Sequence, residues 1–323
     1  MKTYGTIGGK PVYEAVLRDG DVSISVLSHG ATMRDWRVPD ASGKAQSVIL
    51  GFDDIGPYTD NKRSFGILAG RIANRVRDGR FTLDGKAYQL DQNQNGNHLH
   101  GGRDGISRQH WTMEADDKSA RLTLRSPDGA MGYPGNVDFT FVITLDGHTV
   151  TFDITAVPDR PTPIAPAQHN YYRLGAPLAE HVMTIAADRT TAVDEALIPT
   201  GALNPVDGTP LDFRAPKRIG DQRIDDNFCL TGAEPACRVE TDAYALTMTT
   251  DRPGLQVFTG FTLPQFETEG HDGIVYGPFA GLALEAQNYP DTVNNPGFGD
   301  VTATPDRPYR QTTQVTIVPA NTR

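Results

Sequence analysis

The amino-acid sequence predicts an all-β protein that folds as one large antiparallel β-sandwich. Apolar and polar residues alternate with a period of two in many short runs, which is the pattern of strands with one buried face. The 323 residues include 33 Gly and 23 Pro, so turns are frequent. No long stretch combines a helical period with end caps. No linker, low-complexity tract or fixed-period repeat divides the chain, so we expect residues 1–323 to form a single domain.

The expected strands are spread along the whole chain. The first lies in residues 22–26, where valine and isoleucine alternate with serine. A hairpin in residues 81–90 turns at Asp84-Gly85, and a longer hairpin in residues 137–154 turns at Asp146-Gly147. The other candidate strands are residues 121–125, 244–250, 255–259, 282–286 and 314–318. Many short strands separated by turns are typical of sandwiches and barrels.

Composition and charge exclude several classes of protein. The chain has 30 Lys and Arg against 40 Asp and Glu, a net charge of −10, which disfavours binding to nucleic acid or to an anionic membrane. No apolar run approaches the roughly 18 residues that span a bilayer. The N-terminus has no apolar stretch typical of a secretory signal, and Cys229 and Cys237 are too few for a disulfide framework. We therefore expect a cytoplasmic protein with reduced cysteines.

The sequence lacks the common motifs for phosphate binding and nucleophilic catalysis. It has no glycine-rich phosphate loop, no Gly-x-Ser-x-Gly and no Cys-x-x-Cys. His98 and His100 are two apart on an expected strand, so their side chains would point the same way and could ligate a metal. Such a site needs at least one more ligand, and His110 is near only in the sequence. We expect neither a metal nor a cofactor.

Three segments combine proton-transferring side chains with amides and aromatic rings. Sugar hydroxyls need hydrogen-bond donors and acceptors, and the C–H faces of a sugar ring pack on aromatic side chains. The three segments are residues 70–75 with 97–102, residues 168–172, and residues 284–291 with 225–228 and 256–260 upstream. A small-molecule sugar is thus the expected partner.

A series of short motifs also runs through the chain in order. They include Gly-Arg-x-Ala-Asn-Arg at residues 70–75, Leu-His-Gly-Gly at 99–102 and Leu-Glu-x-Gln at 284–287. The others are residues 36–40, 51–54, 79–85, 225–228 and 256–260. The series resembles the aldose 1-epimerase (galactose mutarotase) family and covers nearly the whole chain. The resemblance implies the supersandwich fold of that family and, with it, an isomerase of carbohydrate metabolism that interconverts the α and β anomers of a free aldose.

The resemblance also implies roles for individual residues. A base takes the proton of the anomeric hydroxyl while an acid protonates the ring oxygen, and the ring opens and recloses on the other face. By position in the motifs, the base is Glu285 and the acid is His169, with His100 assisting. The residues implied to hold the sugar hydroxyls are Arg75, Asn74, Asp225 and Gln256. The alternation of residues 282–286 agrees, because Glu285 would face away from the core.

Several alternatives remain open at this point. Arg71 could be a structural ion-pairing residue, and Asp226 could replace Asp225 if the register slips. Arg173 stands where the family has an uncharged residue, so the substrate could be an acidic or unusual sugar unless Arg173 points outward. We expect packing roles for the aromatic residues Tyr171, Tyr172 and Phe258.

Two rival functions are also open. One is glycoside hydrolysis by Asp225 and Glu285, and the other is a sugar-binding or sensing protein without turnover. The sequence leaves open whether the protein is a monomer or a homodimer.

Overall fold

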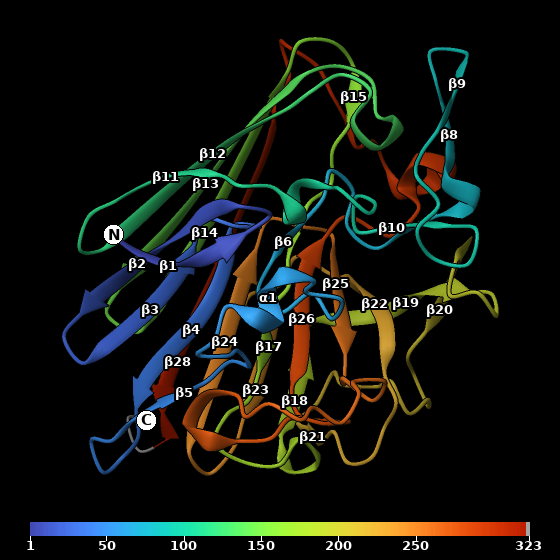
Figure 1. The fold of residues 1–323 in the computed structure, drawn as a ribbon. Coiled ribbons are helices and arrows are strands. Elements are labelled where there is room, and N and C mark those ends of the chain that lie inside the picture. Colours follow the sequence, from blue (N-terminus) through green and yellow to red (C-terminus); the bar gives the residue numbers. More distant parts are fainter. Residues whose placement is uncertain (321–323) are drawn as a thin grey trace.

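The computed structural model describes residues 1–320 and consists mainly of β-strands (Figure 1). Within these residues the three largest sheets contain five, nine and six strands, and neighbouring strands in them run antiparallel. The all-β prediction is therefore confirmed. None of the helices in this part of the chain has the length and apolar character needed to span a bilayer.

Each of the three large sheets has its own strand order, from one edge to the other. The five-stranded sheet contains β1 (Lys2–Ile7), β2 (Lys10–Asp19), β3 (Val22–Leu27), β4 (Thr32–Pro39) and β5 (Ala45–Ser47). The nine-stranded sheet contains β11 (Thr112–Ala115), β12 (Ser119–Ser126), β13 (Val137–Asp146), β14 (Thr149–Pro158), β28 (Tyr309–Pro319), β24 (Tyr244–Thr250), β23 (Cys237–Glu240), β18 (Val182–Ile185) and β21 (Lys217–Arg218). The six-stranded sheet contains β17 (Tyr171–Tyr172), β26 (Leu282–Gln287), β25 (Gly254–Phe258), β22 (Asp225–Leu230), β19 (Ala187–Val193) and β20 (Pro199–Pro205).

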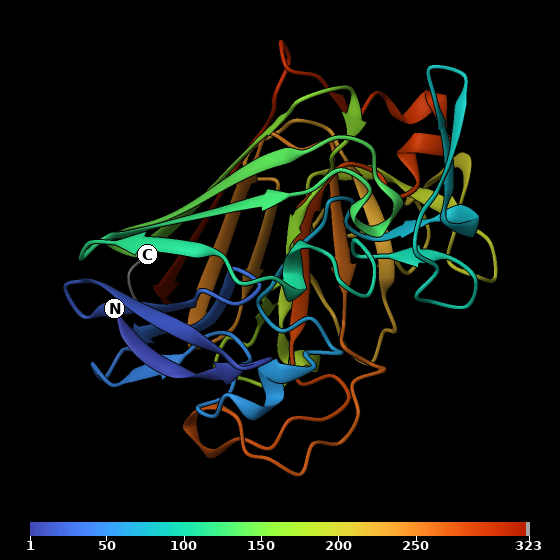
Figure 2. The ribbon, with the colours of Figure 1, turned by 45° about the horizontal axis from the view of Figure 1, so that its top comes forward.

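Short strand pairs and single helical turns connect the sheets. The pairs are β6 (Leu68–Ala69) with β16 (Ala167–Gln168), β7 (Arg75–Val76) with β10 (His98–Leu99), β8 (Arg80–Leu83) with β9 (Lys86–Gln89), and β15 (Thr162–Pro163) with β27 (Thr302–Ala303). The helical turns are α1 (Gly56–Thr59) and the 3₁₀ turns Arg77–Gly79, Ile106–Arg108, Ala130–Gly132, Leu178–Glu180, His271–Gly273, Thr292–Asn294 and Pro296–Phe298. The β8–β9 hairpin projects from the body of the molecule in both views (Figures 1 and 2).

Each strand predicted from the sequence is present. The longer predicted hairpin is β13–β14, closed by the pair Asp146 and Thr149, and the shorter is β8–β9, closed by Leu83 and Lys86. The other predicted runs fall within β3, β12, β24, β26 and β28, and in β25, which ends at Phe258. The regular ladder ends before Thr259, because the N–H of the opposite residue, Ile224, donates to the side-chain Oγ1 of Thr259 and not to its carbonyl.

One apolar core joins the three large sheets. It contains Trp36 from β4, Phe141 and Phe152 from β13 and β14, and Leu255 and Leu284 from β25 and β26, each at most 2% exposed. In Figures 1 and 2 the green strands β11–β13 pass beside the blue five-stranded sheet, and both contribute to this core. Strands facing one another across a shared core are the arrangement of a β-sandwich.

Arg71 ties the loop before β7 to the connection between β12 and β13. Its guanidinium is buried and donates to the carbonyls of Ser126, Pro127, Pro134 and Gly135 at 2.8–3.1 Å, and its Nε donates to Ser126 Oγ at 3.0 Å. Burial lowers the pKa of this guanidinium to about 10, so it stays charged at pH 7. The structural role considered for Arg71 is thus confirmed, although its partners are carbonyl groups and not a carboxylate.

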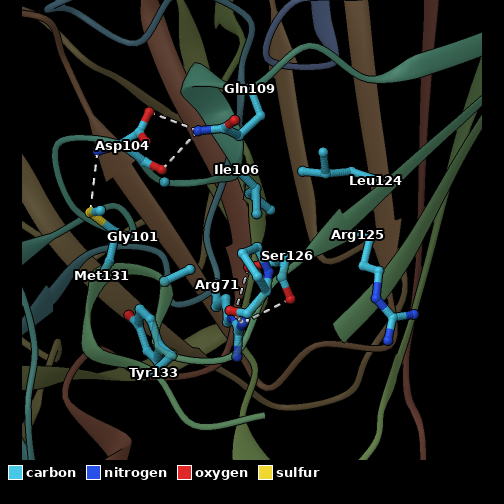
Figure 3. A pocket seen from close by; sticks show the side chains of 13 residues that line it. Arg71, Gly101, Asp104, Ile106, Gln109, Leu124, Arg125, Ser126, Met131 and Tyr133 are labelled. Atoms are coloured by element: carbon cyan, nitrogen blue, oxygen red, sulfur yellow. Dashed lines mark hydrogen bonds between the residues drawn. The ribbon is translucent and has the colours of Figure 1, made fainter. Parts of the chain in front are cut away.

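The loop that Arg71 holds also packs closely on the segment after β10. A Cβ on Gly101 would lie only 1.6 Å from the carbonyl oxygen of Gly70, so this contact requires glycine. On its other side Arg71 borders a hollow of about 220 Å³ that is lined in part by Ile106, Leu124 and Met131 (Figure 3). The loop before β7 and the segment after β10 are therefore held at a fixed distance from each other.

Replacement of Arg71 by leucine is expected to lower the free energy of unfolding by about 3 kcal/mol or more, because several buried carbonyl groups lose a charged donor. The measurement is urea unfolding of Arg71→Leu beside Arg125→Ala. Arg125 is exposed and pairs only with Asp138, so its loss should cost under about 1 kcal/mol. Equal midpoints for the two variants would contradict the anchoring role of Arg71.

Candidate active site

Three strands of the six-stranded sheet place a set of polar side chains on one face. Glu285 on β26 pairs directly with Gln256 on β25, which pairs in turn with Asn227 on β22. Asp225 lies two residues before Asn227 and therefore projects from the same face. Leu284 faces the opposite way and belongs to the core between the sheets. The predicted direction of Glu285 is confirmed, and at 2% exposure it lies in a cleft and not in solvent.

His169 approaches Glu285 from the short connection between β16 and β17. Its Nε2 lies 3.5 Å from Oε1 of Glu285, and both side chains are nearly fully buried. Burial raises the pKa of Glu285 to about 8, with Asp225 adding to the rise and Arg75 opposing it. Burial lowers the pKa of His169 to about 4. At pH 7 these shifts favour an uncharged pair that holds one proton on the carboxyl group.

His100 is fixed by the backbone of Asn74. The N–H of Asn74 donates to His100 Nδ1 at 3.1 Å, and the N–H of His100 donates to the carbonyl of Asn74 at 3.0 Å. Because Nδ1 accepts, the proton of the neutral ring is on Nε2. Burial, together with His169 and Arg75, holds the pKa of His100 well below its usual range. His100 therefore offers a hydrogen-bond donor, with its ring centre 5.3 Å from that of His169.

Arg75, Asp225 and Gln256 form the polar side of the site. Gln256 Nε2 donates to Asp225 Oδ1 at 2.7 Å, and Arg75 Nε donates to Gln94 Oε1 at 2.8 Å. Burial raises the pKa of Asp225, while Arg75 and Gln256 oppose the rise. The structure thus leaves free donor atoms of the Arg75 guanidinium to bind a ligand.

These residues line one pocket of about 170 Å³. Six of the seven site residues predicted from the sequence are among its lining residues, and Gln256 contacts one of them, Asp225. The lining residues absent from the prediction are Lys62, Arg63, Ser64, Gln94, Leu99, Thr262 and Leu263. Leu99 lies on β10, within a motif that the sequence analysis singled out, whereas the other six come from segments without a periodic pattern and no signal in the sequence indicated them. A wider groove of about 640 Å³ shares Lys62, Gln94 and His100 with the pocket.

Three of the open alternatives are decided by the structure. Asp225 lines the pocket, whereas Asp226, its neighbour on β22, projects from the other face. Arg173 lies against the carbonyl of Ala280 and is not among the pocket residues, so it gives no support to an acidic sugar. Tyr172 packs in the core as predicted, but Tyr171 and Phe258 both pack there and line the pocket.

The metal arrangement considered for His98 and His100 is wrong. His98 is enclosed, with Nδ1 2.7 Å from the carbonyl of Asp91 and Nε2 2.7 Å from Tyr133 Oη, while His100 lies beyond the end of β10 and turns toward Asn74. In the described part of the chain, the side chains placed to share a metal ion are His100, His169 and Glu285, with ligand atoms within 4.8 Å of one another. A metal there would need the unprotonated carboxylate and so would displace the proton of the pair.

The fold and the pocket define a class of protein: a β-sandwich with a buried carboxyl–imidazole pair in a polar cleft. The sequence profile of the aldose 1-epimerase family matches residues 13–316, and the chain belongs to this family. Galactose mutarotase of Mus musculus is 38% identical over 322 residues, which is 95% of this chain and 94% of that protein. The protein is therefore an isomerase that interconverts the anomers of an aldose.

Solved structures give the same result. A GalM/aldose epimerase homologue from C. elegans superimposes with a TM-score of 0.90 at 26% identity, over 95% of this chain and 99% of that chain. Galactose 1-epimerase from Lactobacillus acidophilus NCFM superimposes with a TM-score of 0.87 at 29% identity, over 98% of both chains. The predicted fold of the family is thereby confirmed.

Loss of the side chain that holds Arg75 should weaken sugar binding. We expect Gln94→Ala to raise KM about tenfold with a small change in kcat, because the Arg75 guanidinium loses the acceptor that orients it. The measurement is the initial rate of mutarotation against sugar concentration. Gln92→Ala is the matched control, since the side chain of Gln92 is exposed and donates to the carbonyl of Asp78. An unchanged KM in Gln94→Ala would show that Gln94 does not orient Arg75.

Proposed function

We propose that Glu285 and His169 catalyse the anomer exchange of a free aldopyranose, with galactose among the substrates. The observation that carries the proposal is the 3.5 Å approach of two buried titratable groups in a pocket lined by hydrogen-bonding side chains. The names of the relatives support galactose, since the mouse protein and the Lactobacillus acidophilus protein are named for it.

The proton count of the pair matches the chemistry. The pair holds one proton, and the reaction starts when this proton has passed from Glu285 to His169, so that in the reacting closed-ring complex Glu285 is the carboxylate and His169 the imidazolium. Glu285 takes the proton of the anomeric hydroxyl as His169 gives its proton to the ring oxygen, and the C1–O5 bond breaks to leave the aldehyde. The pair still holds one proton, now on Glu285. After rotation about C1–C2, the reverse transfers close the ring on the other face and restore the starting state.

The other pocket residues have binding roles in this proposal. Arg75 and Asn74 donate to sugar hydroxyls, Asp225 accepts from them, and Gln256 orients Asp225 through their 2.7 Å bond. His100 donates from Nε2 to the reacting end of the sugar. Phe258 and Tyr171 offer aromatic faces to the C–H groups of the ring.

Three further expectations are part of the proposal. The core shared by all three large sheets supports one domain. The cysteines Cys229 and Cys237 are both free and buried, which agrees with a cytoplasmic location. We propose a monomer or a homodimer, since each chain carries a full set of pocket residues.

Glu285→Gln and His169→Asn should each lower kcat by about 10²-fold or more, because each removes one proton-transfer group. The measurement is one-dimensional proton NMR of freshly dissolved α-D-galactose, following the anomeric signals with and without protein. Glu114→Gln, an exposed carboxylate on β11, is the control and should retain full activity. Full activity in Glu285→Gln would overturn the assignment of the base. Tight galactose binding by a wild-type protein with no rate effect would favour the sugar-sensing alternative.

The pH profile of kcat/KM tests whether the two groups act as a pair. The pair carries a single proton between the two pKa values of about 4 and about 8. We expect kcat/KM to be constant in this window and to fall tenfold per pH unit outside it. Below the window the imidazole is protonated while the carboxyl group keeps its proton, and above the window the carboxyl group loses its proton. A single transition near pH 6.5, the value of an ordinary imidazole, would contradict a buried pair.

A further inference from the structure

Two buried amides lie beside the catalytic pair without a role in the proposed mechanism. Among residues 1–320, Asn227 and Gln287 are the side chains whose amide nitrogen and oxygen are both buried without a hydrogen-bond partner. Their exposed fractions are 2% and 1%. The second carboxylate oxygen of Glu285, Oε2, is also buried without a partner, as is the hydroxyl of Thr191.

The strand register places these groups together. Gln287 is two residues after Glu285 on β26, and Asn227 pairs with Gln256, which pairs with Glu285. All of them therefore project from the face that carries the pocket. Thr191 follows Thr190, which pairs with Phe228, so it lies next to Asn227 on β19.

Gly254 allows the Asn227 amide to approach the backbone of β25 closely. It pairs directly with Gln287, and a Cβ on it would lie 2.9 Å from both Nδ2 and Oδ1 of Asn227. The Asn227 amide thus lies over the glycine that pairs with Gln287, and the Tyr289 ring lies at 2.9 Å from the same Cβ position. Any larger residue at position 254 would clash with Asn227 and Tyr289.

Energetics requires that these groups have partners. A buried amide or carboxylate without a hydrogen bond costs about 1–3 kcal/mol per group. Apolar side chains of the same shape would pack here without that cost. Small polar spaces of this kind are usually satisfied by ordered water that makes about three hydrogen bonds.

We propose that Asn227 and Gln287 hold ordered water beneath Glu285 and that this water fixes the carboxylate through Oε2, leaving Oε1 directed to His169 and the sugar. The inference rests on the proposed role of Glu285 as base. Asn227 and Gln287 are then positioning residues, since they act through the water and Glu285. The charged and titratable groups that line the pocket with Glu285 are Asp225, Arg75, His169, His100, Tyr171, Lys62 and Arg63, and none of them is altered by changes at positions 227 and 287.

The variants Asn227→Leu and Gln287→Met remove the amides and keep the side-chain volume. We expect kcat to fall about tenfold, as is usual for groups that orient a catalytic residue, with little change in KM. The alkaline limb of the kcat/KM profile should move up by about one pH unit, because the carboxylate loses its solvation and its pKa rises. Gln287→Asn keeps an amide and should restore part of the activity and the limb.

The control is Gln311→Met. Gln311 is an equally buried amide whose partners are Tyr309 and the carbonyl of Ala286, and it lies in the core on the other side of β26. Its loss should lower the free energy of unfolding and leave the alkaline limb unmoved. If Asn227→Leu and Gln287→Met behave like Gln311→Met, the two amides are structural and the inference is wrong.

A crystal structure of the wild-type protein at high resolution gives an independent test if the variants fold poorly. Water within about 3 Å of Glu285 Oε2 and of either amide would support the inference. Direct hydrogen bonds between the two amides, with no such water, would overturn it. Failure of the proposed function would be distinct, because then Glu285→Gln itself would retain activity.

Discussion

The register of β26 is the constraint on which the rest of the site depends. Antiparallel pairing with β17 and β25 directs alternate residues to opposite faces, so Leu284 enters the core while Glu285 enters the pocket. A slip of one residue would exchange these environments and place a carboxyl group in the apolar core. The hydrophobic pattern that stabilises the sandwich thus also fixes the position of the carboxyl group that we propose as the base. Core and site are set by the same hydrogen-bonded ladder.

Burial on that face gives the site its chemistry. Glu285 and His169 both lose solvation, so the carboxyl group binds its proton more tightly and the imidazole less tightly than in water. One proton can therefore pass between the two groups without a change in the net charge of the pair. From the pocket wall Asp225 adds to the rise in the pKa of Glu285, while Arg75 opposes it. Arg71, although only four residues before Arg75, acts on the fold alone, since its donors are used by backbone carbonyls.

Much of this arrangement could be predicted because strand periodicity is a local property. The hairpin β13–β14 and the direction of Glu285 follow from alternation within a few residues. Motif resemblance located His169 and Asp225 for the same reason, since each lies in a short characteristic segment. The expectation that His98 and His100 point the same way was wrong because β10 ends at Leu99, and the next residue turns toward Asn74.

The sequence by itself determined the strands, the face of β26 that carries Glu285 and the family. The loops that complete the pocket, which contribute Gln94 and Arg63, were known only from the folded chain. The same is true of Arg173, which lies against Ala280 and outside the pocket. The tertiary structure also decided the protonation of the catalytic pair, because a pKa depends on burial and on neighbours from distant strands. Such contacts join residues far apart in the chain, and no local pattern encodes them.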